Sequence, residues 1–115
     1  MTSTRVVVHI EYRAQAGRVD QAVSDLDTLI ATVVATELDC FGIRLLQDPQ
    51  DPANLLLIEE WSSRDAYLGP HFQTAHLEAF ITRASEIFEG PPVIQFWLPK
   101  SEHLREVPHG VRGLA

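Results

Sequence analysis

The sequence predicts an α+β fold, a sandwich in which one antiparallel four-stranded sheet carries helices on one face. Segments rich in β-branched residues and segments with helical periodicity follow one another in the order βαββαβ. A turn dense in Asp and Pro, residues 48–52, separates the second and third strands and predicts a hairpin. At 115 residues, 45% of them hydrophobic and 22% charged, the chain suits one domain with a modest core.

The first half of the chain supplies a strand, a helix and a second strand. Residues 5–12 are rich in Val and predict the first strand, which Ala16 and Gly17 end. Apolar residues then recur every three or four positions, which predicts an amphipathic helix over residues 18–36. Residues 40–46 are the predicted second strand.

The second half begins with a strand predicted over residues 55–61. Ser62, with Asp65 three residues later, predicts the cap of a short helix that ends near Leu68. Pro70 suits the first turn of the next, longer helix.

That longer helix is predicted over residues 71–88, because Gly90 and two prolines stop it. Residues 93–98 are the predicted fourth strand. The complete order is that of a ferredoxin-like sandwich, with the sheet on one side and the helices on the other.

We predict one domain over residues 1–98 and a polar tail over residues 99–115, which contains His103 and His109. The third strand begins with four aliphatic residues, so both of its faces favour burial. Because helices can cover only one face of the sheet, we expect a homodimer that packs sheet to sheet.

Charge and composition exclude several classes of function. The net charge of −7 and the pI near 5.0 disfavour binding to nucleic acid and to anionic membranes. Cys40 is the single cysteine, so neither an intramolecular disulfide nor a zinc site with paired thiols is expected. No apolar stretch approaches membrane-spanning length, and we expect a cytoplasmic protein.

The second long helix and the third strand carry the candidate site. Phe72, His76 and Phe80 fall on one helical stripe that faces the sheet. Glu59 and Trp61 project from one side of the strand. A base would thus lie beside an aromatic wall, as chemistry on a phenolic ring requires. The alternative is a core histidine with satisfied ring nitrogens and a tryptophan that only packs.

His71, in the first turn of the predicted helix, is a second candidate base. The helix dipole favours its neutral form, which is a competent general base near pH 7. The alternative is a residue that faces solvent near the cap. Five helical residues correspond to about 140° of rotation, so a metal pair made by His71 and His76 alone is not expected.

These residues resemble the antibiotic biosynthesis monooxygenase family, in particular its small bacterial quinol monooxygenase branch. The resemblance covers roughly residues 6–98 and is most specific in the pattern E-x-W…H-x-x-T-x-H-x-x-x-aromatic. Here that pattern is Glu59 and Trp61 followed by His71, Thr74, His76 and Phe80. Weaker matches are Glu11, Gly17, Glu37 and Cys40.

The resemblance implies a dimeric α+β barrel and the oxidation of phenolic, quinol or anthrone-type rings by molecular oxygen, without metal, flavin or haem. The residues it implicates in the site are Glu59, Trp61, Tyr67, Phe72, His71, His76 and Phe80. Two departures concern substrate identity, because Asp39 replaces a usual glycine and Ile43 a frequent tyrosine. Haem degradation is disfavoured, since Ile81 stands where such relatives have an iron-binding histidine.

The mechanism we expect removes a phenolic proton, and the resulting anion passes an electron to oxygen. His76 or His71 is the base, with Glu59 orienting an imidazole. Trp61 walls the ring, and Tyr67 donates a hydrogen bond to the developing peroxide.

Two other interpretations remain open on the sequence. The chain could be a non-oxidative member of the same architecture, either an isomerase of a small metabolite or a ligand-binding dimer, because fold does not fix function. A third interpretation takes His9, His71, His76 and His103 as an adventitious metal site.

Overall fold

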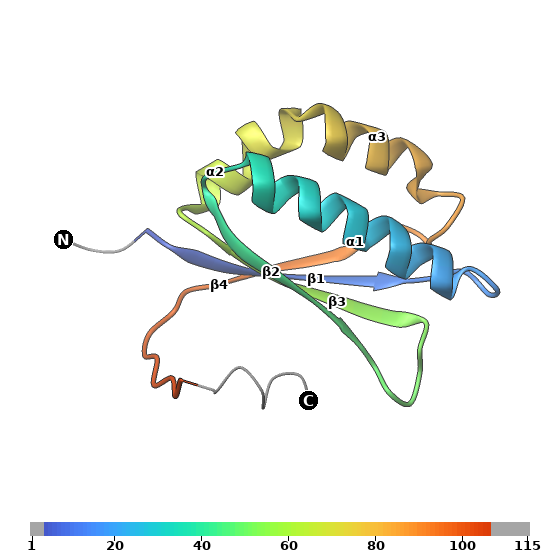
Figure 1. Cartoon of the computed structure of the whole chain (residues 1–115), viewed down its shortest axis with the longest axis horizontal. Coiled ribbons are helices and arrows are strands. Elements are labelled where there is room, and N and C mark those ends of the chain that lie inside the picture. The colour runs from blue at the N-terminus through green and yellow to red at the C-terminus, as the bar shows by residue number, and fades with distance from the viewer. Residues whose placement is uncertain (1–3, 107–115) are drawn as a thin grey trace.

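The computed structural model of the chain describes residues 4–106, and its elements follow the predicted order. They are β1 (Val6–Arg13), α1 (Val19–Thr36), β2 (Cys40–Gln47), β3 (Asn54–Trp61), α2 (Arg64–Leu68), the 3₁₀ helix η1 (Pro70–Gln73), α3 (Ala75–Ala84) and β4 (Val93–Trp97). The strands form one antiparallel sheet of order β2-β3-β1-β4, and the helices lie on one face of it (Figure 1). The ferredoxin-like α+β fold is therefore confirmed.

The core lies between the sheet and the helices. Alternate residues of β1 and β3 face the helices, so Val8 and Leu57 are almost fully buried while their neighbours face the other side. Helix α1 contributes Leu26 and Val33, seven residues apart on its inner stripe. These contacts fix the spacing between the helices and the sheet. The cavity described below lies in the space between these two layers.

The predicted helix over residues 71–88 is divided into two elements, and the second ends at Ala84, earlier than predicted. Thr74 has extended backbone angles (φ −73°, ψ 145°) and ends η1 before α3 begins. Its hydroxyl donates a hydrogen bond of 2.8 Å to the carbonyl of His71 and accepts one of 3.4 Å from the amide of Leu77. A threonine that caps one helix while holding the preceding turn is favourable, because it satisfies backbone groups that the break leaves without helical partners.

The cap of α2 is also one residue later than predicted. Ser63, not Ser62, accepts a hydrogen bond of 3.0 Å from the amide of Ala66. The hydroxyl of Ser62 instead donates a bond of 2.7 Å to Asp39, which joins the residue before the cap of α2 to the turn between α1 and β2. Sequence spacing alone did not distinguish the two adjacent serines.

The described part of the C-terminal tail has no helix or strand after Trp97. It leaves β4 on the side of the sheet away from α1 and α3 (Figure 1). Glu102 forms an ion pair of 2.8 Å with Arg5, and His103 is exposed. The rest of the predicted tail, including His109, lies outside the described residues. Within residues 4–106, no helix is long and apolar enough to cross a membrane.

Candidate functional site

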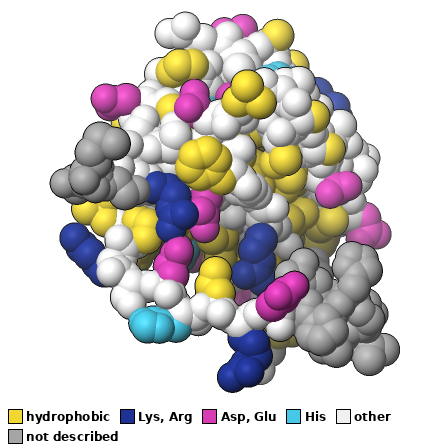
Figure 2. All heavy atoms as spheres, turned by 60° about the vertical axis from the view of Figure 1, so that its left-hand side comes forward, with side chains coloured by type: hydrophobic (Ala, Val, Ile, Leu, Met, Phe, Trp, Pro, Cys, Tyr) yellow, Lys and Arg dark blue, Asp and Glu magenta, His cyan; other side chains and the backbone are white. Residues whose placement is uncertain are grey.

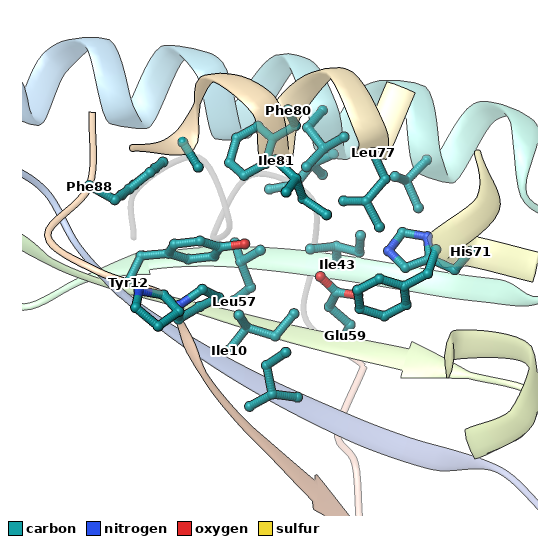
Figure 3. Close-up of a pocket in the computed structure, with 18 of the residues that line it drawn as sticks. Ile10, Tyr12, Ile43, Leu57, Glu59, His71, Leu77, Phe80, Ile81 and Phe88 are labelled. Atoms are coloured by element: carbon teal, nitrogen blue, oxygen red, sulfur yellow. The ribbon is translucent and has the colours of Figure 1, made fainter. Parts of the chain in front are cut away.

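A cavity of about 760 Å³ lies between the helix-facing side of the sheet and the inner faces of α1 and α3 (Figure 3). Most of its lining is aliphatic or aromatic, including Ile10, Ile43, Leu57, Leu77, Phe72, Phe80 and Phe88. Few ionisable side chains interrupt this lining, and the inner ones are Tyr12, Glu59, Tyr67 and His71. An apolar chamber with a few converging polar groups is the usual form of a small-molecule site.

Glu59 is a buried carboxyl group on the floor of this cavity. Its side chain leaves β3 toward the helices, opposite Ile43 of β2, and it is only 3% exposed. Its Oε1 atom accepts a hydrogen bond of 2.8 Å from the indole N–H of Trp61. Burial raises the pKa of Glu59 to about 7, although the Trp61 hydrogen bond opposes this shift. Near neutral pH, Glu59 can therefore donate or accept a proton.

The ring of His71 is packed between two aromatic side chains at the other end of the cavity from Tyr12 (Figure 3). Its centroid lies 4.6 Å from that of Trp61 and 5.2 Å from that of Tyr67, on which it is stacked at 27°. His71 is 4% exposed, and burial lowers its pKa below the ordinary value of 6.5, although the hydrogen bond that it donates to Glu37 opposes this. The neutral imidazole is therefore favoured at pH 7.

Glu37 fixes the orientation of this imidazole. The Nδ1 atom of His71 lies 2.9 Å and 3.1 Å from the two carboxylate oxygens of Glu37. Because a carboxylate only accepts hydrogen bonds, Nδ1 carries the proton and donates it. The lone pair of a neutral His71 is then on Nε2.

The Nε2 atom of His71 has no hydrogen-bond partner in the described part of the chain. Every fully buried side-chain nitrogen or oxygen of these residues has a partner, so Nε2 is not fully buried, and His71 lines the cavity. The same reasoning applies to the hydroxyl groups of Tyr12 and Tyr67, which also line the cavity. Burial raises the pKa of both phenols, and the nearby Glu59 adds to this, so they remain hydrogen-bond donors.

The side chain of His76 does not face the sheet, contrary to what the helical stripe predicted. It does not line the cavity of about 760 Å³; its side chain is 23% exposed and lines a smaller cavity, of about 270 Å³, between α1 and α3. The buried residue of α3 is its neighbour Leu77. The helix begins only at Ala75, so the predicted rotation between His71 and His76 does not apply, and both rings contact Glu37.

The structure brings together several other expected residues. Tyr67, Phe72 and Phe80 line the cavity, whereas Trp61, at 1% exposure, lies behind His71 and is not part of the wall. Glu59 contacts Trp61 rather than an imidazole, so Glu37 has the orienting position that we expected for Glu59.

Two polar residues of the site had no catalytic or binding role in the sequence interpretation, although Glu37 was a weak match to the family. Tyr12 shares a strand face with Ile10, and this alternation was a usable signal. Glu37 caps the C-terminal end of α1, and nothing local indicates that it meets residues 34 and 39 positions later.

The four histidines of the metal interpretation do not converge. His9 projects from the open face of the sheet, where its ring lies 5.7 Å from Trp97. His71 and His76 are on the helix side. Among residues 4–106, no group of three His, Cys, Asp or Glu side chains could hold a metal ion.

Comparison with known proteins assigns the chain to a family. The model of the family described as antibiotic biosynthesis monooxygenase matches residues 5–83. The chain belongs to this family. The matched range contains every residue of the site from Tyr12 to Leu77, including both histidines and both glutamates.

Several solved structures share the fold of this chain. Rv0793 from Mycobacterium tuberculosis is 22% identical, with a TM-score of 0.74, and the match covers 85% of this chain and 97% of that one. PA3566 from Pseudomonas aeruginosa is 24% identical, with a TM-score of 0.77 and coverages of 88% and 99%. A conserved protein from Methanosarcina mazei is 19% identical, with a TM-score of 0.74 and coverages of 85% and 95%. No curated protein matches the chain.

Proposed function

We propose that this member of the family is a cofactor-independent monooxygenase, which uses molecular oxygen to oxidise a phenolic, quinol or anthrone-type ring. One observation carries the proposal. A histidine with a lowered pKa presents an accessible Nε2 to a large apolar cavity, and a carboxylate fixes its other nitrogen. The family supports oxygenase chemistry, and the cavity supports an aromatic substrate.

The size of the cavity suits a substrate of two or three fused rings. Its volume of about 760 Å³ lies toward the upper end of the range of about 300–1,000 Å³ that is usual for small-molecule sites. Phe72, Phe80 and Phe88 offer ring faces and edges for packing. An apolar chamber also favours oxygen and excludes water, which would otherwise solvate the substrate anion.

His71 is the base in this proposal. Its Nε2 accepts the proton of a phenolic hydroxyl, whose ordinary pKa is about 10. The imidazolium that forms is adjacent to Glu37, which stabilises the positive charge. The substrate anion is electron-rich enough to pass one electron to triplet oxygen, and recombination of the two radicals forms a C–O bond.

The peroxide then collapses with the atoms balanced. For a ring that carries hydrogen at the attacked carbon, ortho or para to the ionised hydroxyl, one substrate and one O₂ give one quinone and one water. The O–O bond breaks, the C–H proton at that carbon leaves, and His71 returns a proton to the departing oxygen. The substrate is the only reductant, so no flavin or metal is required.

The remaining polar groups position the ring and the peroxide. Tyr67 and Tyr12 donate hydrogen bonds, because burial keeps both protonated. Protonated Glu59 donates from Oε2 to a second oxygen of the ring, while Trp61 holds Oε1. All three donors act in a dry cavity, where electrostatic interactions are stronger than in water.

A second candidate function is an isomerase of a small oxygenated metabolite. The observation that favours it is the pairing of a carboxyl group of pKa about 7 with a neutral imidazole in one cavity. Such a pair can move a proton between neighbouring carbons without oxygen.

The protein is proposed to work as a homodimer in the cytoplasm. The open face of the sheet carries Val93 and Trp97, which are 57% and 53% exposed in one chain. Hydrophobic side chains also reach the surface among acidic and basic groups in the view of Figure 2. Packing against a second copy would bury the open face.

The test is oxygen uptake by metal-stripped protein with hydroquinones, naphthohydroquinones and anthrones. We expect uptake above autoxidation, with one water formed per quinone, and a loss of about 100-fold or more in His71→Gln. His103→Gln, an exposed histidine outside the cavity, is the control. Full turnover in His71→Gln would show that His71 is not the base. If wild type takes up no oxygen with any of these substrates, the isomerase becomes the favoured function.

A further inference from the structure

Glu37 is shared by two histidines that face different cavities. One of its oxygens accepts a hydrogen bond of 2.9 Å from His71, and the other accepts one of 2.7 Å from His76. Its side chain is 11% exposed, between those of His71 at 5% and His76 at 23%. The chain of contacts therefore runs from the buried cavity toward the solvent.

The position of Glu37 is unfavourable for its helix. It is the C-cap of α1, and its amide closes the last turn by donating to the carbonyl of Val33. A carboxylate at this end faces the negative pole of the helix dipole. Two imidazole N–H donors offset that cost, so the carboxylate and both histidines form one unit.

The groups around this unit come from every neighbouring element. The ring of His71 interacts with Glu37 of the α1 cap, Tyr67 of α2 and His76 of α3. The carboxylate of Glu37 also interacts with Cys40 of β2 and Glu59 of β3. His76 shares its smaller cavity with Asp25 and Arg83, which are 3.4 Å apart. Asp25 and Arg83 pair with each other, and Glu37 is the partner of His76.

We propose that His76 is a positioning residue: through the carboxylate of Glu37, it holds His71 in the tautomer that leaves Nε2 able to accept a proton. This rests on the proposed role of His71 as the base. Without a second donor, the carboxylate can rotate away from Nδ1, and His71 can adopt the other tautomer, whose Nε2 carries a proton and is no base. His76 does not touch the cavity of about 760 Å³, so it acts only through Glu37.

Two substitutions separate the N–H donor from the rest of the ring. His76→Gln keeps an N–H group that can reach Glu37, whereas His76→Leu removes it and keeps an apolar volume. We expect turnover in His76→Gln to stay within about threefold of wild type, and in His76→Leu to fall about tenfold or more.

The decisive measurement does not need turnover. The ¹⁵N shifts of the imidazoles report which ring nitrogen of His71 is protonated in the free protein. We expect the Nδ1–H form in wild type and in His76→Gln, and a mixture of tautomers in His76→Leu. Glu37→Gln should also give the mixture, and it replaces His76→Leu if that variant does not fold. Glu86→Gln and His103→Leu, both at exposed positions, are the matched controls.

Each outcome decides the role of His76. An unchanged Nδ1–H tautomer in His76→Leu overturns the proposal, and so does an equal change in His76→Gln and His76→Leu. If wild type oxidises no quinol, the proposed oxygenase fails while the tautomer experiment still tests the link between the two histidines. The two failures are thus distinguishable.

Discussion

The indole N–H of Trp61 and the carboxyl group of Glu59, two residues apart on one face of β3, are joined by a buried hydrogen bond of 2.8 Å. Trp61 lies behind the cavity and Glu59 within it. The tryptophan therefore affects the cavity through the charge state of its neighbour, because a donor to a carboxylate stabilises the ionised form.

Replacing Trp61 with Phe should raise the pKa of Glu59 above its present value of about 7. The hydrogen bond that favours the carboxylate is lost, while burial and Glu37, which both raise the pKa, remain. An infrared titration of the carboxyl band measures the shift directly. Loss of packing should lower the free energy of unfolding by about 1–2 kcal/mol. A pKa of Glu59 that falls in Trp61→Phe would contradict the assigned hydrogen bond.

The raised pKa of Glu59 should make the protein less stable as the pH rises. Below about pH 4.5 the carboxyl group is protonated in both states, and between about 4.5 and 7 only the unfolded state ionises. The free energy of unfolding should therefore fall by up to about 3 kcal/mol across this window and stay constant above it. Denaturant titrations of Glu59→Gln and wild type at several pH values measure this difference.

Glu59→Gln should lack this decline and be more stable than wild type at pH 8. Glu86→Gln, at an exposed position, should follow the wild-type curve and serves as the control. Parallel curves for Glu59→Gln and wild type would show that Glu59 ionises equally in the folded and unfolded states.

Activity should have an acid limb that belongs to His71. Burial lowers its pKa below 6.5, so the neutral base persists to lower pH than an exposed histidine would allow. The rate should therefore fall only below pH 6.5, and an alkaline limb near 7 should follow the ionisation of Glu59. The pH dependence of kcat/KM for wild type and Glu59→Gln tests both limbs. An alkaline limb that survives in Glu59→Gln would assign it to another group.

The sequence predicted the elements well because periodicity and turn residues are local signals. Residues 48–52 mark the hairpin between β2 and β3, and alternation along β3 correctly placed Glu59 and Trp61 on one face. The break at Thr74 was missed, because a threonine within an apolar stripe resembles a helical residue until its hydroxyl is seen to cap α3.

The site was harder to predict because its central contact is not local. His71 and Phe80 followed from the motif, Phe72 from the helical stripe and Tyr67 from the family resemblance. All four line the cavity. The role of Glu37 depends on how α1 packs beside η1 and α3, which no spacing within either segment encodes. The error at Thr74 also displaced His76, since one break in a helix rotates every later side chain.

The proposed dimer gives the last prediction. Ile58 lies on the open face of β3, next to Glu59 on the other face, and a lysine at this position should prevent two sheets from packing together. Light scattering should give a dimer for wild type and a monomer for Ile58→Lys. Ala31→Lys, which adds the same charge at an exposed position of α1, should remain dimeric. A wild-type protein that is monomeric at micromolar concentration would show that the open face has a different role.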